Sequence, residues 1–187
     1  STDRDLARYE VPGHRWADIG EHGFGAALLT DSTYGYSARG STLRLSLLRA
    51  PRLPDPEADR GRHAFAYAVL PHAGSWQDGG VVGEAAAFNA RLRWAAAPPP
   101  GTWAAVEGAE GLVLDSVKRA EDGDGIVLRL YEAHGGRGTA SVRLVRPVAA
   151  ASRATLLEEP EEALEVHGGA VVVPFRPWEI VTVRVTG

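Results

Sequence analysis

Short runs in which apolar and polar residues alternate, separated by glycine-rich turns, are the feature that most constrains the fold of this chain. Leu43, Leu45 and Leu47 alternate with Arg44 and Ser46, so an extended strand here has one apolar and one polar side. Comparable runs recur at residues 64–70, 126–131, 140–145, 170–175 and 180–185. Many short strands between turns predict an all-β fold, built as an antiparallel β-sandwich.

Turn-forming residues divide the chain into strands and domains. Glycine-rich segments at residues 122–125, 135–138 and 167–169 separate neighbouring runs, as turn residues do in hairpins. A triple proline at 98–100 follows an alanine-rich stretch, and proline is excluded from central strands. We therefore predict a domain boundary near residues 95–108 and divide the chain at about residue 108, with domains at 1–108 and 109–187. The segment 158–164 is the candidate for a helix.

Composition excludes several classes of partner. Hydrophobic residues make up 44% of the 187 residues and charged residues 24%, so the chain can bury a core. Its apolar runs are too short to cross a membrane, and a net charge of −4 argues against nucleic acid. The sequence has no cysteine, which excludes disulfides and fits a cytoplasmic protein. It also has no methionine, and we therefore expect a segment of a longer polypeptide.

Four polar residues near the N-terminus, His14, Asp18, Glu21 and His22, are candidate metal ligands. Their spacing matches no strong metal-binding motif, so hydrogen bonding near strand ends is the favoured interpretation. Asp18 and Glu21 are also conceivable as an acid–base pair, but nothing in the sequence makes them converge in a cleft. We therefore assign no metal ligand and no catalytic residue to this chain.

Other features have both a structural and a functional interpretation. The segment Asp122-Gly-Asp124-Gly resembles part of a calcium loop but lacks a third acidic position and a distal glutamate, which favours a hairpin turn. Four tryptophans are candidates for a sugar-stacking platform: Trp76, Trp94, Trp103 and Trp178. Buried core or interface aromatics are commoner, so packing is the favoured interpretation. The acidic segment 158–162 is expected to be a solvated turn.

Seven short sequence motifs, called blocks here, are distributed along nearly the whole chain. They read GHRWADIGE at 13–21, GAALLTDSTYGY at 25–36, LRLSLLRAP at 43–51, PDPEADRGRH at 54–63, YAVLPH at 67–72, LDSVKRAED at 114–122 and PFRPWEI at 174–180. Together they resemble the C-terminal β-sandwich region of glycoside hydrolase family 38 α-mannosidases, and most closely the cytosolic and bacterial branch. Two positions depart from the family pattern: Thr30, where asparagine is common, and Thr33, where lysine is common.

The resemblance implies an architecture and an activity. Residues 1–108 would be the C-terminal part of a galactose-mutarotase-like super-sandwich, and residues 109–187 a small closing β-sandwich. The implied reaction is hydrolysis of terminal α-mannosides with retention, through an aspartate nucleophile and a second carboxyl group. The family carries the nucleophile and the ligands of a zinc or other divalent ion in an N-terminal barrel, starting with a His-x-Asp segment that this chain lacks. This chain alone is therefore expected to be inactive and to hold no cofactor.

The resemblance also implies four substrate-binding candidates. Some family members place an arginine beside the sugar at the end of the strand that corresponds to residues 43–48, and Arg49 is the closest match. Tyr34, Gly35 and Tyr36 precede that strand and would line the same cleft, with a ring stacked on a sugar face. The long polar loop at 51–63 would brace the arginine. Packing between domains is the alternative role for these residues.

The expected partners are a mannoside, bound through the complete enzyme, and the missing N-terminal catalytic part. Association into a homo-oligomer is a further option, and neither nucleic acid nor a membrane is expected. Two other functions stay open. One is a stand-alone carbohydrate-binding β-sandwich, which would bind mannosides without a barrel. The other is an interaction protein whose free sheet edge pairs with another chain.

Overall fold

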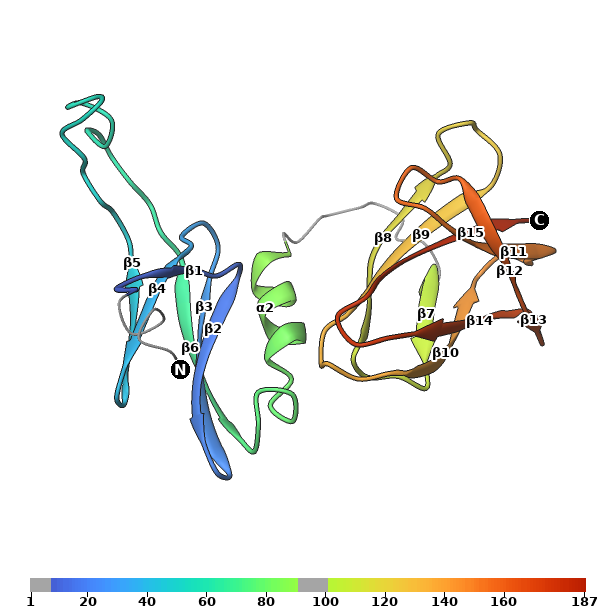
Figure 1. The fold of residues 1–187 in the computed structure, drawn as a ribbon, viewed down its shortest axis with the longest axis horizontal. Helices are drawn as coiled ribbons and strands as arrows, with labels where there is room; N and C mark the ends of the chain where they lie inside the picture. The colour runs from blue at the N-terminus through green and yellow to red at the C-terminus, as the bar shows by residue number, and fades with distance from the viewer. Residues whose placement is uncertain (1–7, 91–100) are drawn as a thin grey trace. The chain divides into compact units, whose positions relative to one another are not determined.

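The computed structural model describes residues 8–90 and 101–187. The chain forms two compact units, Ser1–Trp94 and Ala95–Gly187 (Figure 1). Both units are built from antiparallel strands, so the predicted all-β class is confirmed.

The units divide between residues 94 and 95, at the start of the predicted boundary segment 95–108 and before the chosen division at residue 108. Strand β7 (Ala104–Glu107), which that prediction assigned to the first domain, pairs with β10 (Gly138–Leu144) in the second unit. Val106 of β7 lies opposite Val142 and packs on the core of the second unit, which explains why the strand belongs there. The triple proline on which the prediction rested lies outside the described residues.

Two three-stranded antiparallel sheets make up the first unit in the part of the chain that the structure describes. One has the order β1–β4–β5, with bounds Val11–Pro12, Gly35–Arg39 and Thr42–Ser46. The other has the order β2–β3–β6, with bounds Trp16–Glu21, Phe24–Thr30 and Tyr67–Ala73.

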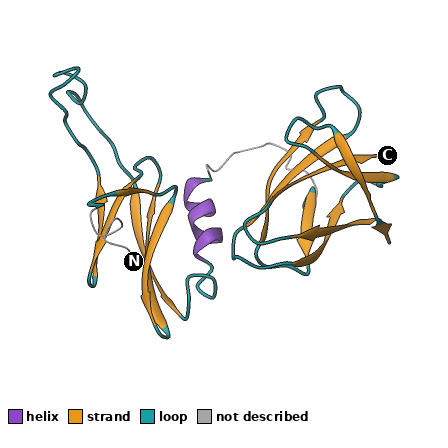
Figure 2. Ribbon diagram, viewed as in Figure 1, coloured by secondary structure: helices purple, strands orange, loops and turns teal. Residues whose placement is uncertain are grey.

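Helix α2 (Val81–Asn89) packs on one face of the β2–β3–β6 sheet (Figure 2). Its residues Val81 and Ala85 are buried with Leu29 of β3, and three consecutive alanines favour the helix locally. Gly80 adopts the left-handed conformation before the first turn, with φ of 63°. The sequence did not predict this helix, because nine residues are too few for a clear helical period. No helix within residues 8–90 and 101–187 is long and apolar enough to span a membrane.

The second unit is a β-sandwich of two antiparallel sheets. One sheet has the order β13–β14–β10–β7, in which β13 is Val166–His167 and β14 is Ala170–Phe175. The other has the order β12–β11–β15–β9–β8, with bounds Pro160–Leu164, Ala150–Ala154, Ile180–Thr186, Ile126–Glu132 and Leu112–Arg119.

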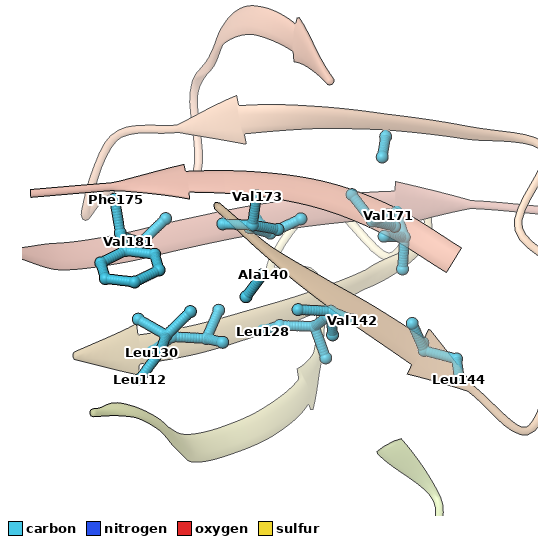
Figure 3. Close-up of a cluster of buried hydrophobic side chains, with 13 residues drawn as sticks. Leu112, Leu128, Leu130, Ala140, Val142, Leu144, Val171, Val173, Phe175 and Val181 are labelled. Atoms are coloured by element: carbon cyan, nitrogen blue, oxygen red, sulfur yellow. The ribbon is translucent and has the colours of Figure 1, made fainter. Parts of the chain in front are cut away.

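Apolar side chains from both sheets fill the interior of this sandwich (Figure 3). Val181 and Val183 of β15 join Val171 and Val173 of β14 in one buried cluster. In each strand these residues occupy alternate positions, as the sequence predicted for a strand with one buried side. Burial of each such side chain contributes roughly 1.5–3 kcal/mol to folding, so this cluster is the main source of the unit's stability.

The helix predicted at residues 158–164 is wrong. Residues Pro160–Leu164 form strand β12 at the edge of a sheet, where Ala163 pairs with Ser152 of β11. Pro160 is the first residue of this edge strand, a position where the missing N–H of proline is tolerated. The solvated turn predicted at 158–162 is also wrong for Glu158, whose side chain is 6% exposed and accepts a contact from Lys118 Nζ at 2.7 Å.

The two sides of β6 have different environments. Ala68 and Leu70 pack on the cluster beneath α2, whereas Tyr67 and Val69 are 57% and 67% exposed. Phe24 of β3 projects to the same side as Tyr67 and Val69 and is half exposed. We call these three residues the open face of the first unit. The sequence predicted the alternation in β6 but not which side would be covered.

Candidate functional site

The loop between β5 and β6, residues 47–66, projects from the first unit and is called the arm below (Figure 1). Arg49 stands at its base, three residues after Ser46, which is the Cα partner of Gly35. Tyr34 directly precedes Gly35, so Arg49 and Tyr34 lie at the same end of the β4–β5 pair. Both side chains are exposed, as contact with a ligand would require.

Hydrogen bonds within the arm hold its base in one conformation. The Ala50 N–H donates to Asp59 Oδ2 at 2.6 Å, and His63 Nε2 donates to the carbonyl oxygen of Asp59 at 2.9 Å. Ala50 has a φ of 48°, a conformation that a non-glycine residue adopts only when its surroundings hold it. The imidazole of His63 stacks on Phe65 with an interplanar angle of 3°. Asp59 therefore fixes the backbone directly after Arg49.

The return end of the arm is tied to the turn between β3 and β4. Asp31 N donates to the Ala66 carbonyl, and Ala66 N donates to Asp31 Oδ1, both at 3.2 Å. Hydrogen bonds from the Ser32 hydroxyl and from the Ala66 N–H hold the pKa of Asp31 below its ordinary value. The return end of the arm is thus anchored to the turn that leads to Tyr34.

A shallow groove of about 450 Å³ runs beside Tyr34 and is lined by Pro12, Gly13, His14 and Tyr34. The Tyr34 ring is 50% exposed and tilts against His14, with ring centroids 5.7 Å apart. A partly exposed aromatic ring at a groove provides an apolar surface that suits the C–H face of a sugar.

The other two substrate-binding candidates, Tyr36 and Gly35, are less accessible than Arg49 and Tyr34. Tyr36 is 2% exposed and its ring packs against Gly13, so this ring is not accessible for stacking on a sugar. Burial raises the pKa of the Tyr36 hydroxyl, which has no hydrogen-bond partner among the described residues. Gly35 lies in the middle of the sheet, between Pro12 and Ser46. Of the four candidates, the structure leaves Arg49 and Tyr34 with side chains that a ligand can reach.

A buried carboxylate–imidazole pair lies under α2. His72 Nε2 of β6 donates to Asp18 Oδ2 of β2 at 2.7 Å, and the two side chains are 4% and 10% exposed. His72 Nδ1 is buried without a hydrogen-bond partner among the described residues. The sequence singled out Asp18 but not His72, although the histidine belongs to the block YAVLPH.

The set of four candidate metal ligands does not assemble. Asp18 contacts His72, and His14 contacts Tyr34, while Glu21 and His22 are exposed at the turn between β2 and β3. Across residues 8–90 and 101–187 the structure has no group of three or more His, Cys, Asp or Glu side chains that could hold a metal ion.

A second buried carboxylate, Glu132 at the end of β9, joins two loops of the second unit. Its Oε1 accepts the His134 N–H at 2.9 Å, and its Oε2 accepts the N–H groups of Gly135 and Trp178 at 2.8 and 2.9 Å. Burial favours the neutral acid, but these backbone donors and Gly136 outweigh it and lower the pKa of Glu132. Trp178, with φ of 60°, is held against Gly135 by this carboxylate. No pattern in the sequence pointed to this role.

The remaining sequence candidates have structural contacts. Asp122-Gly-Asp124-Gly forms the hairpin turn between β8 and β9, where Arg184 donates to Asp122 Oδ2 at 2.6 Å. Trp76 packs on the core under α2, whereas Trp103 and Trp178 are half exposed or more. Trp94 lies outside the described residues. The four tryptophans therefore do not share one environment.

The two departures from the family pattern contact each other. Thr30 at the end of β3 and Thr33 in the following turn are buried, and their hydroxyl oxygens lie 2.6 Å apart. The Thr33 N–H also points to Thr30 Oγ1 at 3.4 Å. Each hydroxyl thus provides the hydrogen-bond partner that the other needs once it is removed from water.

Comparison with known proteins identifies both units. Residues 1–57 match the glycosyl hydrolases family 38 C-terminal domain, and residues 111–183 match the family 38 C-terminal beta sandwich domain. Alpha-mannosidase 2C1 of Homo sapiens is 45% identical over 97% of this chain, and Alpha-mannosidase G of Dictyostelium discoideum is 36% identical over 98%. The chain spans 18% of the length of each of these relatives.

Solved structures show the same fold. A glycosyl hydrolase family 38 protein from Enterococcus faecalis superposes with a TM-score of 0.72 at 18% sequence identity, over 94% of this chain and 22% of that protein. An alpha-mannosidase from Enterococcus faecalis V583 gives the same TM-score at 20% identity. Since the matched domains and relatives agree with the fold, this chain belongs to glycosyl hydrolase family 38, as part of its C-terminal β-sandwich region.

Proposed function

We propose that this chain is a non-catalytic C-terminal portion of an α-mannosidase, and that it supports and partly lines the active site of a catalytic domain outside it. The main support for this proposal is the alignment with Alpha-mannosidase 2C1. The alignment covers 97% of this chain but only 18% of the length of that protein. Retaining hydrolysis needs two carboxyl groups on either side of the scissile bond. The buried carboxylates Asp18, Glu132 and Glu158 are instead engaged by His72, by backbone N–H groups and by Lys118.

The open face supports a docking role for the first unit. Phe24, Tyr67 and Val69 expose half or more of their surface on one side of the β2–β3–β6 sheet. Exposed apolar side chains gathered on a sheet mark a protein interaction surface. We assign this surface to the part of the α-mannosidase polypeptide that lies outside the present chain, which would add strands to the same sandwich.

The arm supports a role at the substrate. Arg49 carries a planar guanidinium whose several N–H donors suit directional hydrogen bonds to sugar hydroxyls. The Asp59 carboxylate fixes the Ala50 backbone, which limits the orientations open to Arg49. Tyr34 at the same end of β4–β5 supplies an apolar ring. The proposed function therefore includes carbohydrate contact by Arg49 and Tyr34, in an enzyme of the cytosolic and bacterial branch with a cytoplasmic location.

The test compares the activity of this chain alone with that of the complete enzyme, expressed from the full reading frame that encodes this chain. Hydrolysis of 4-nitrophenyl α-mannoside is expected from the complete enzyme and not from the 187-residue chain. In the complete enzyme, Arg49→Ala is expected to lower kcat/KM by about 10- to 100-fold, the loss of one or two charge-assisted hydrogen bonds. Arg52→Ala on the same arm is the matched control and should leave kcat/KM within about twofold.

Two outcomes contradict the proposal. One is metal-dependent hydrolysis by the pure 187-residue chain. The other, which concerns the arm alone, is an equal effect of Arg49→Ala and Arg52→Ala on kcat/KM. The alternative of a stand-alone carbohydrate-binding module predicts that the isolated chain binds mannose, and calorimetry with mannose separates it from the proposal.

A further inference from the structure

A cleft of about 690 Å³ opens at one end of the sandwich in the second unit. It lies where β8 and β10 end, where β9 begins and where β15 ends. Ile126, Leu144 and Val185 line it and also belong to, or pack on, the buried cluster, so the cleft leads toward the space between the sheets. Its size is within the range of about 300–1,000 Å³ that small-molecule sites occupy.

The charged side chains that line this cleft are all cationic: Lys118, Arg119 and Arg146. Glu121 and Glu158 neutralise Lys118, and Arg119 donates from Nε and Nη2 to the Gly123 carbonyl at 3.2 and 3.0 Å. Arg146 is exposed, and no hydrogen bond or ion pair joins it to the rest of the described chain. No aspartate or glutamate side chain among the described residues lines the cleft, and the α-carboxylate of Gly187, which does line it, forms no ion pair with Arg146, so the guanidinium of Arg146 is available to an anion.

Trp103 lies on the rim of the cleft. Its carbonyl oxygen accepts the Val145 N–H at 2.9 Å, which fixes the Trp103 backbone beside the end of β10. Arg146 directly follows Val145 in the sequence. The indole is 50% exposed. An exposed indole and a free guanidinium in one cleft suit a ligand that has both a ring and an anionic group, because the ring covers the indole face while the oxyanion binds the guanidinium.

Another edge of the cleft is held by hydrogen bonds within the protein. It is the hairpin turn between β8 and β9, where Arg184 Nη2 donates to Asp122 Oδ2 at 2.6 Å and to the Asp124 carbonyl at 2.9 Å. Gly125, with φ of 88°, leaves no room for a side chain against the Val185 backbone. A rim that is already ordered reduces the entropy lost when a ligand binds.

We propose that this cleft binds a small oxyanion that carries a ring, of the class of sugar phosphates. The ring lies against Trp103, and the phosphate is bound by Arg146 and by the free N–H groups of Arg119. A neutral sugar lacks the charge and inorganic phosphate lacks the ring, so each binds more weakly than the combination. Every residue used here lies in the second unit, so the inference does not depend on the function proposed above.

Calorimetry on the whole 187-residue chain tests the site, with mannose 6-phosphate as the probe. Saturable binding is expected, and Arg146→Ala and Trp103→Ala should each weaken it by about tenfold or more. Arg137→Ala and Trp178→Ala change an exposed arginine and an exposed tryptophan outside the cleft and should leave the affinity unchanged. Mannose and inorganic phosphate, titrated separately, are the controls for ring and charge.

An NMR titration of the unsubstituted chain keeps the test valid if Trp103→Ala fails to fold. Mannose 6-phosphate is expected to shift the Trp103 indole N–H and the amides of Gly123 and Gly125. The proposal is overturned by the absence of saturable binding, by shifts confined to other residues, or by affinity that survives both substitutions. Inorganic phosphate that binds as tightly as mannose 6-phosphate would also overturn it, because the ring would then contribute nothing.

Discussion

His72 on β6 reaches Asp18 on β2 across the whole width of β3, with 2.7 Å between Nε2 and Oδ2. The strand between them carries Gly25 directly opposite His72, and a side chain at that position would lie 2.7 Å from Nε2. A side chain added at Gly79, before α2, would likewise lie 2.6 Å from Cγ of His72. Gly25 and Gly79 thus leave the space that the His72 imidazole occupies. The His72–Asp18 hydrogen bond then joins β6 and β2, the two outer strands of the sheet.

Gly25→Ala is expected to destabilise the first unit by about 1–3 kcal/mol, since the added methyl group displaces His72 and strains the packing around it. Gly83→Ala is the matched control. Gly83 lies in α2 with open space around it, so the same substitution should be neutral or stabilising by up to about 1 kcal/mol. Chemical denaturation of both variants measures the difference, and equal stabilities would contradict the steric role of Gly25.

Glu132→Gln is expected to lower the unfolding free energy at pH 7 by about 2–4 kcal/mol, because one amide oxygen replaces two charged acceptors and the amide N–H₂ then faces backbone donors. Glu110→Gln changes an exposed glutamate of the same unit and should cost less than about 0.5 kcal/mol. Urea titrations of the three proteins measure these differences. If both variants lose the same stability, the hydrogen-bonded role of Glu132 is wrong.

The same carboxylate predicts a pH dependence. The folded pKa of Glu132 lies below its ordinary value of 4.5. Its contribution to stability is therefore fully present above pH 4.5 and is lost as the pH falls through the depressed folded value. Unfolding free energies measured from pH 7 downward should fall below this point, and the fall should be shallower in Glu132→Gln. An identical acid slope in both proteins would count against the prediction.

The Thr30–Thr33 contact predicts a coupling measurable by a double-mutant cycle. Thr30→Val leaves the buried Thr33 hydroxyl and the Thr33 N–H without their shared partner and should cost about 1–3 kcal/mol. Thr33→Val should cost less, because the backbone N–H of residue 33 still points to Thr30 Oγ1. In the double variant no hydroxyl is left unpaired, so its loss should be smaller than the sum of the single losses. Additive losses would show that the two hydroxyls do not stabilise each other.

Asp59→Ala is expected to loosen the arm without unfolding the unit. The substitution frees the Ala50 N–H, and a loss of about 1 kcal/mol in local stability corresponds to about fivefold faster cleavage of the arm by trypsin. Glu57→Ala, which breaks only the exposed ion pair with Arg60, is the control and should change the rate little. Limited proteolysis followed by mass spectrometry identifies the cleaved bonds, and equal rates in both variants would exclude Asp59 as the brace.

Local pattern predicted the strands because a sheet with one buried side imposes a two-residue period that is visible in any single strand. The alternation in 43–47 and 180–185 therefore sufficed to predict β5 and β15. The sequence blocks likewise predicted the family, because several motifs in the same order along a chain are specific to one family. Pattern failed for α2, because nine residues cover too few turns, and for β12, because charged residues at a sheet edge show little alternation.

The sequence by itself thus determined the all-β class and the membership of family 38, while tertiary structure decided which side chains meet. Tyr34 and Tyr36 stand two residues apart, yet one is exposed and the other buried against Gly13. Asp18 was visible as a polar residue near a strand end, but its partner His72 is defined only by the sheet in which β3 joins the two strands. The physical reason is that a side chain's environment depends on segments distant in sequence, and their positions follow from the packing of the whole unit.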